Sequence, residues 1–316
     1  MNKVSRVDSV PQPSRGPHTH RGSAEVEAAL TAGLSEILGN DAPAPLAEAM
    51  RHAVLGPGSR FRPRLLFAVA ESIGRYDERF ASHAATAIEL LHAASLVHDD
   101  LPAFDDASVR RGVPTVHVRF GEAIAVLAGD ALIVGAYEHL HTGVQHHPRG
   151  HEALRILFRA GGAAAGLAKG QALELLPCEG NEALSRYHHA KTGVLFEAAA
   201  ALGALSAHAD PGPWLAIGRE LGLFYQHLDD LADVLGDPAR LGKDVGKDAR
   251  HGRPSRADLV PPGSGPRLVA ETAMERLTPQ IQRVREAVPV GAEALRRYLE
   301  SLLQEATARM LPLPGA

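Results

Sequence analysis

Residues 88–106 of this chain read IELLHAASLVHDDLPAFDD. The first half repeats apolar residues every three positions, which is the period of one helix face; these residues are Ile88, Leu91, Ala94 and Val97. The second half places four carboxylates directly after that helix, and they are Asp99, Asp100, Asp105 and Asp106. The stretch therefore predicts a buried helix that delivers acidic side chains to its C-terminal end.

A second acidic cluster ends another apolar helix, at residues 226–233, QHLDDLAD. Asp229 and Asp233 are four residues apart, so they share a helix face and repel by a few tenths of a kcal/mol. A cation would offset that cost, and ligands that are all oxygen favour a hard ion such as Mg²⁺. Mg²⁺ usually takes one or two protein carboxylates together with substrate phosphates, so the clusters suggest a phosphorylated substrate. The alternative is that both clusters are solvated helix ends.

Basic residues occur in each polar break of the chain, as a bound polyphosphate would require. The candidates are Arg60, Arg62, Arg64, Arg110, Arg111, Lys191, Lys243, Lys247 and Arg250. The chain contains no local zinc motif, phosphate-binding loop or dinucleotide fingerprint. The acidic-then-basic pattern occurs twice, which favours a site over unrelated surface charges.

The rest of the sequence predicts an all-α bundle. From residue 23 onward apolar residues recur at helical spacing, and no alternating pattern indicates a convincing sheet. The segments 123–136 and 194–207 are nearly apolar all round, which places them in the centre of a bundle or at a subunit interface. We expect a flexible tail at residues 1–22, one helical domain at 23–316, and a mobile polar loop at 236–265.

Composition excludes several classes of protein. The chain has 316 residues, is 45% hydrophobic and carries a net charge of −4, so no global basic field indicates nucleic-acid binding. No apolar run approaches the roughly 20 residues of a membrane span, and the N-terminus has no signal-peptide core. The single cysteine, Cys178, fits a reducing compartment, and we expect a cytoplasmic protein.

Taken together, these motifs resemble the trans-isoprenyl diphosphate synthases, also called polyprenyl synthetases. Residues 99–112 look like the family's first Asp-rich motif in its longer bacterial form, and residues 224–233 look like the second. Four further elements occur in the expected order around them: residues 89–92, 170–171, 191–193 and 242–243.

The resemblance implies an isoprenoid-synthase-type helical bundle around a deep central cavity, usually a homodimer. It implies head-to-tail condensation of an allylic diphosphate with isopentenyl diphosphate, helped by Mg²⁺, three ions being expected together with the substrate diphosphate. The expected metal ligands are Asp99, Asp100, Asp105, Asp229 and Asp233. The residues expected to hold the allylic diphosphate are Arg110, Lys191, Thr192, Gln226 and Lys243. Those expected to hold isopentenyl diphosphate are Arg62, His92 and Arg111, with help from Arg60. The residues expected to be catalytic are Asp99, Asp105, Asp229, Lys191 and Arg110.

Two positions depart from the family pattern. Ser59 stands where the family usually has a lysine that contacts isopentenyl diphosphate, and Arg60 or Arg64 could compensate for its loss. One lost charge-assisted contact costs about 1.5–3 kcal/mol. Arg253 stands where a lysine is common, which keeps the charge but not the shape.

The resemblance also bears on product length. In this family the residues just before the first motif form the floor of the chain-elongation tunnel, and here Ala94 and Ser95 are small. Leu91 and Leu90, one turn deeper, could set the next floor. The pattern resembles bacterial carotenoid-pathway geranylgeranyl diphosphate synthases, so we expect a twenty-carbon product. The alternatives are a longer- or shorter-chain synthase, a non-catalytic regulatory subunit of such an enzyme, and a terpene cyclase.

Overall fold

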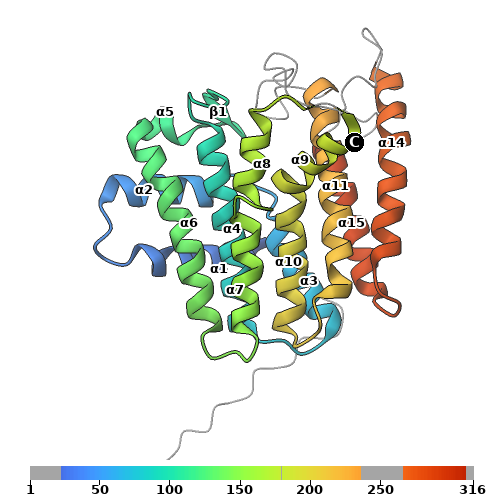
Figure 1. Cartoon of the computed structure of the whole chain (residues 1–316), viewed down its shortest axis with the longest axis horizontal. Coiled ribbons are helices and arrows are strands. Elements are labelled where there is room, and N and C mark those ends of the chain that lie inside the picture. Colours follow the sequence, from blue (N-terminus) through green and yellow to red (C-terminus); the bar gives the residue numbers. More distant parts are fainter. Residues whose placement is uncertain (1–22, 179, 236–265, 311–316) are drawn as a thin grey trace, which may run out of the picture.

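The structure is a computed structural model that describes residues 23–178, 180–235 and 266–310 (Figure 1). The described chain is a bundle of helices with one small hairpin, so the all-α prediction is confirmed. The expected tail and the polar loop at 236–265 lie outside the described residues. The elements are α1 (Ser23–Leu38), α2 (Ala44–Leu55), α3 (Phe61–Ile73), α4 (Glu78–Asp99), β1 (Val109–Arg110), β2 (Val113–Pro114), α5 (Val116–Phe120), α6 (Glu122–Val144), α7 (Gly150–Gly161), α8 (Leu167–Glu174), α9 (Gly180–His188), the π-helix η1 (His189–Gly193), α10 (Val194–Ser206), α11 (Gly212–Leu235), α14 (Pro266–Ala287) and α15 (Glu293–Met310).

Helix α4 is the central element that positions the first Asp cluster. It begins where the side chain of Asp77 accepts a hydrogen bond from the backbone N–H of Phe80, at 3.0 Å, which satisfies one exposed helix donor. Small residues line most of its length, and it packs on α6, α3 and α10. It ends at Asp99, so the first carboxylate pair, Asp99 and Asp100, lies buried at the C-terminal end of the helix.

Helix α10 forms the centre of the other half of the bundle. It packs against α3, α11 and α4, and nearly every residue in it is buried. A helix with no polar face can be stable only where neighbours cover all its sides. The prediction that the apolar segment at 194–207 is central is therefore confirmed.

The segment between α4 and α5 contains a two-stranded antiparallel hairpin that the sequence did not predict. Val109 pairs with Pro114 and Arg110 with Val113. Its two turn residues, Arg111 and Gly112, have φ values of 53° and 80°, as two-residue hairpin turns require. Strands of two residues are too short to show an alternating pattern, so hydrophobic periodicity does not predict this hairpin.

Helix α6 is apolar on two sides. One side is buried against α4, whereas Val126, Leu127 and Val134 are exposed on the other. By length and composition alone this helix could cross a membrane, although no comparable run was recognised in the sequence. Its packing on α4 is what a core helix of a bundle would also show (Figure 1).

Candidate active site

The carboxylate of Asp99 is the centre of the candidate site. It is buried at the end of α4, where the amide nitrogen Nε2 of Gln171 donates to its Oδ1 at 3.0 Å. The ammonium of Lys191 lies 3.8 Å from its Oδ2. The same amide nitrogen of Gln171 also donates to the carbonyl of Ser95, at 3.1 Å. Gln171 thus fixes one carboxylate oxygen of Asp99 and leaves the other facing a cation.

Asp100 and Arg110 form a bidentate ion pair across the loop that follows α4. The Nε of Arg110 donates to both carboxylate oxygens of Asp100, at 2.8 and 2.9 Å, and its NH2 lies 2.7 Å from Oδ1. Burial raises the pKa of Asp100, and Arg110 partly offsets that rise. The backbone N–H of Asp105 donates to the carbonyl of Asp99 at 2.9 Å. This hydrogen bond folds the loop back on itself, so the backbone of Asp105 lies next to that of Asp99.

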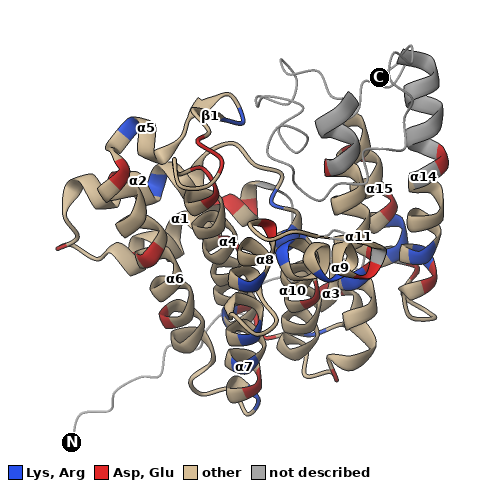
Figure 2. Ribbon diagram, turned by 45° about the horizontal axis from the view of Figure 1, so that its top comes forward, with Lys and Arg blue, Asp and Glu red and all other residues tan. Residues whose placement is uncertain are grey.

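Lys191 comes from the π-helix η1, a form of helix that is rare and frequent at functional sites. Its ammonium is paired with Glu174, whose other carboxylate oxygen accepts from the hydroxyl of Tyr187 at 3.2 Å. Burial alone would lower the pKa of Lys191, but Asp99 and Glu174 raise it above its usual value. The lysine therefore stays charged. Figure 2 shows acidic and basic residues close together in this part of the bundle.

Close backbone approach between α8 and η1 holds these groups together. A Cβ added to Gly170 would lie 2.5 Å from both the Cα and the backbone N of Lys191. Only glycine lets the two segments approach this closely, because the clashing atoms belong to the backbone. The pair at 170–171 thus serves two purposes, since Gly170 admits η1 and Gln171 binds Asp99.

Helix α11 joins the site through Gln226. The hydroxyl of Thr192 donates to its Oε1 at 2.8 Å, and Gln226 is buried. Asp229 lies one turn further along α11 on the same face. Asp233 is on the same helix, but its side chain lies outside the described residues, as does the whole of Lys243. The hydrogen bond between Thr192 and Gln226 brings the second motif next to the first.

A second group, predicted to hold isopentenyl diphosphate, is partly buried near the first. The guanidinium of Arg62 lies 4.6 Å from the ring centroid of Phe196, and its Nε has no hydrogen-bond partner among the described residues. Burial lowers the pKa of Arg62. Burial, followed by the charges of Arg62 and Arg111, lowers the pKa of His92 well below its usual value, so His92 is neutral. A buried cation with an unpaired donor is costly unless an anion binds it.

The structure gives Arg60 and Arg64 other partners than those expected. Arg60 donates to Glu27 at 2.7 Å, to Glu89 at 2.9 Å and to a backbone carbonyl, and it is buried. Arg64 pairs with Glu305 on α15 at 3.0 Å. Both guanidinium groups are engaged by protein carboxylates, so these contacts do not support compensation for Ser59. The assignment of Arg60 to isopentenyl diphosphate stays a prediction.

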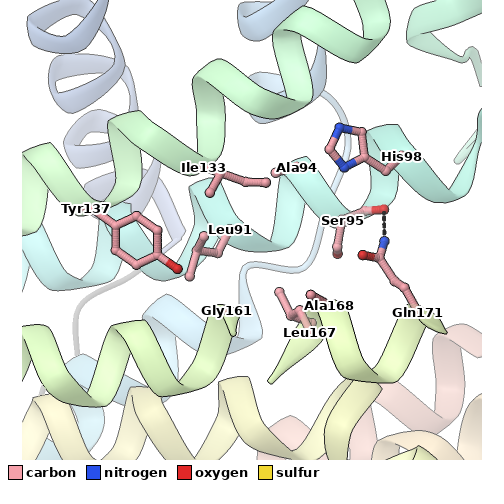
Figure 3. A pocket seen from close by; sticks show the side chains of 10 residues that line it. All are labelled: Leu91, Ala94, Ser95, His98, Ile133, Tyr137, Gly161, Leu167, Ala168 and Gln171. Carbon is pink, nitrogen blue, oxygen red and sulfur yellow. Dashed lines mark hydrogen bonds between the residues drawn. The ribbon is translucent and has the colours of Figure 1, made fainter. Parts of the chain in front are cut away.

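Below Asp99, a pocket runs along α4 between α6, α7 and α8 (Figure 3). Its cavity volume is about 50 Å³, and the open solvent at its mouth brings the empty space to about 320 Å³. The three residues predicted to set product length, Leu91, Ala94 and Ser95, all line it, whereas Leu90 does not. Gln171 and His98 line one end. At the other end a Cβ on Gly161 would lie 2.2 Å from the hydroxyl of Tyr137 and 3.7 Å from Leu91.

The residues at the mouth of this pocket fit Mg²⁺ by their chemistry. The predicted ligands from α4 and α11 are all carboxylates, and cations border them instead of further ligands of nitrogen or sulfur. Such a donor set suits a hard ion that shares its coordination with phosphate oxygens.

Three residues of the site were not predicted from the sequence. Glu174 holds Lys191, Tyr137 closes the pocket, and Glu89 pairs with Arg60. Glu174 follows Gln171 by three residues and shares its helix face, a signal that could have identified it. Tyr137 lines the pocket only because α6 packs on α4, and no local sequence pattern predicts that packing.

Comparison with known proteins gives a consistent result. A family profile described as polyprenyl synthetase matches residues 43–259. The geranylgeranyl diphosphate synthase of Cereibacter sphaeroides is 39% identical over 88% of this chain and 95% of its own length. The farnesyl diphosphate synthase of Escherichia coli is 42% identical over 68% of this chain and 75% of its own. Among solved structures, a geranyltransferase of Helicobacter pylori complexed with magnesium and isoprenyl diphosphate has a TM-score of 0.74 at 28% identity, covering 91% of this chain and 99% of that one.

Proposed function

Because the chain belongs to the polyprenyl synthetase family, we propose that it condenses isopentenyl diphosphate with an allylic diphosphate to give geranylgeranyl diphosphate. The observation that carries the proposal is the apolar pocket that starts beside Asp99 and follows α4 away from the charged groups. A site of this form holds a diphosphate at its mouth and a hydrocarbon chain inside.

In the first step, the bond between C1 and oxygen of the allylic diphosphate breaks and the diphosphate leaves with the electron pair. Lys191 and Arg110 stay charged and can stabilise that leaving group. Thr192, Gln226 and Lys243 are proposed to position it. Bound Mg²⁺, held by Asp99, Asp105 and Asp229 with Asp100 and Asp233 nearby, would neutralise further charge on the diphosphate. Enzymes of this family are generally Mg²⁺-dependent, and we propose three ions.

In the second step, the double bond of isopentenyl diphosphate attacks the allylic C1, and the carbon–carbon bond forms. A proton is then lost from the adduct to the released diphosphate, so no side-chain base is needed. Arg62, with its unpaired Nε, together with Arg111 and neutral His92, is proposed to hold the diphosphate of isopentenyl diphosphate. The pocket walls exclude water from the cation through Leu91, Ile133 and Leu167.

The proposed length of twenty carbons rests on the space beside Ala94. An aromatic residue there would block the pocket next to Ser95, whereas alanine leaves it open for one more helix turn, to Leu91 and Tyr137. One turn rises about 5.4 Å, comparable to one isoprene unit. The similarity to a geranylgeranyl diphosphate synthase supports this length, and the similarity to a farnesyl diphosphate synthase makes fifteen carbons the closest alternative.

The reaction is tested by measuring diphosphate release with Mg²⁺, isopentenyl diphosphate and, in turn, dimethylallyl, geranyl and farnesyl diphosphate. We expect release only when both substrates are present, and its loss in Asp99→Asn. The exposed surface variant Arg186→Gln is the control that keeps activity. Release from an allylic diphosphate alone would indicate a cyclase. No release from the folded protein with any starter would indicate a non-catalytic subunit and overturn the proposal.

We also propose a homodimer that buries the exposed apolar side of α6. Leu127 and Val134 are seven residues apart, so they share one helix face, and they are 54% and 65% exposed. Exposed apolar patches of this kind on a helix mark interaction surfaces.

A further inference from the structure

A cluster of metal-ligating side chains lies outside the site already described. Glu36 on α1, His83 on α4 and His139 on α6 bring one carboxylate oxygen and two imidazole nitrogens within 4.8 Å of one another. His83 lies sixteen residues before Asp99 on the same helix, so the two sites are about 24 Å apart. No local sequence motif predicts this cluster, because each ligand comes from a different helix.

The spacing of the three atoms is close to what a shared ion needs. The Oε2 of Glu36 lies 3.5 Å from the Nδ1 of His139 and 3.8 Å from the Nε2 of His83. Tetrahedral ligands at zinc–ligand distances of 2.0–2.1 Å lie about 3.4 Å apart. The imidazole rings are stacked, with centroids 4.2 Å apart, so one ring has to tilt for both nitrogens to reach one ion. His83 is the less buried of the two and can make that adjustment.

The orientation of His83 is what metal ligation requires. Its Nδ1 lies 2.8 Å from the carbonyl of Arg79, and because a carbonyl can only accept, Nδ1 must carry the hydrogen. In the neutral ring, Nε2 then offers a lone pair toward Glu36. Metal-bound histidines usually donate their other ring N–H to a backbone carbonyl in this way.

Two glycines leave the space that the two imidazole rings occupy. A Cβ on Gly33 of α1 would lie 2.7 Å from the Nε2 of His139, and one on Gly143 of α6 would lie 2.4 Å from the Cβ of His83. Close contact with α1 thus covers Nε2 of His139 and leaves Nδ1 facing Glu36.

We propose that Glu36, His83 and His139 bind a divalent transition-metal ion of the zinc type, with water as a fourth ligand. Two imidazoles and one carboxylate suit Zn²⁺, Co²⁺ or Ni²⁺ better than Mg²⁺, which prefers oxygen alone. The ion joins α1 to the α4–α6 pair. Helix α1 also supplies Glu27 to the ion pair with Arg60, so the ion would tie down a helix that already contacts the start of α3.

The test uses the full chain with any purification tag removed and with chelator-treated buffers. Zn²⁺ and Co²⁺ are titrated in the presence of excess Mg²⁺, which occupies the carboxylate-rich site. We expect one Zn²⁺ per chain, a rise of several degrees in Tm, and a tetrahedral Co²⁺ absorption spectrum.

Three variants make the assignment specific. Glu36→Gln and His83→Asn change exposed or partly exposed residues, so they are expected to fold and to bind Zn²⁺ at least about tenfold more weakly. His147→Gln is the matched control, because His147 and His208 form another stacked pair, bonded to each other at 3.3 Å, which belongs to no group of three metal-ligating side chains among the described residues. It should bind Zn²⁺ like the wild type. Equal Zn²⁺ affinity in wild type, Glu36→Gln and His83→Asn, or no rise in Tm with Zn²⁺, would overturn the proposal and leave an ordinary histidine–carboxylate contact.

Discussion

At the scale of single residues, the most constrained group is His92. It is partly buried among guanidinium groups, and its environment keeps it neutral where an ordinary histidine starts to titrate. That environment follows from the arginines that α3 and the hairpin bring close to His92, of which Arg62 and Arg111 have the largest effect. The cost of this environment is that protonation of His92 would bring another positive charge next to the arginines, which is unfavourable.

This cost predicts how stability depends on pH. The unfolded chain binds a proton at His92 below pH about 6.5, whereas the folded chain does not until the pH is much lower, so the free energy of unfolding falls as the pH drops through this window. His92→Gln should remove up to about 1.4 kcal/mol of that loss per pH unit. Urea unfolding at pH 7.5, 6.5 and 5.5 measures the slope, with the exposed His146→Gln as control. Identical slopes in wild type and His92→Gln would contradict the assignment.

Tyr137 makes the second prediction at this scale. Its hydroxyl closes the pocket against Gly161, and its ring packs on Phe158 at 5.0 Å. Tyr137→Ala should open the floor and shift the products by at least one isoprene unit, to 25 carbons or more, as mass spectrometry would show. Phe158→Ala removes the outer ring without touching the pocket lining and should leave product length unchanged. If Tyr137→Ala gives wild-type products, the floor lies elsewhere.

At the scale of elements, the contact between α8 and η1 controls the geometry of the site. The π-helix presents Lys191 to Asp99, and Gln171 on α8 reaches the same carboxylate. Both depend on the absence of a side chain at residue 170. The two elements therefore act as one unit, although they are separated by the whole of α9.

Gly170→Ala tests this contact. The added methyl would lie 2.5 Å from the backbone of Lys191, so one element must move, at a cost of about 1–3 kcal/mol in stability. A displacement near 1 Å can cost about 100-fold in rate, and we expect kcat/KM to fall by that order. Gly212→Ala is the control, since its added methyl would make an ordinary contact at 3.4 Å. Unchanged kcat/KM in Gly170→Ala would show that α8 and η1 are not coupled.

At the scale of the whole molecule, much of the fold could be predicted because the signals are local. The period of α4 and the carboxylates after it occupy 19 consecutive positions, residues 88–106. Contacts between distant positions could not be predicted in this way. The ion pairs of Arg60 and Arg64 are an example, because their carboxylate partners Glu27 and Glu305 are 33 and 241 positions away. The roles of the metal and diphosphate ligands remain predictions.

The exposed side of α6 gives the prediction at this scale. If it is a dimer interface, Leu127→Glu combined with Val134→Glu should convert the protein to a monomer in light scattering after size-exclusion chromatography, since charges are depleted at interface cores. Val290→Glu is the control, because Val290 is fully exposed and lies far from α6 in the sequence. A monomeric wild type, or a double variant that stays dimeric, would contradict this use of the surface.

The pocket beneath Asp99 is proposed to limit the product to one length. The most direct measurement is the mass of the products that the wild-type protein makes from isopentenyl diphosphate and farnesyl diphosphate with Mg²⁺. A dominant twenty-carbon diphosphate is the predicted result, with Ala94→Phe shifting synthesis from geranyl diphosphate to a fifteen-carbon product. A wild type that stops at fifteen carbons, or that runs well past twenty, would contradict it.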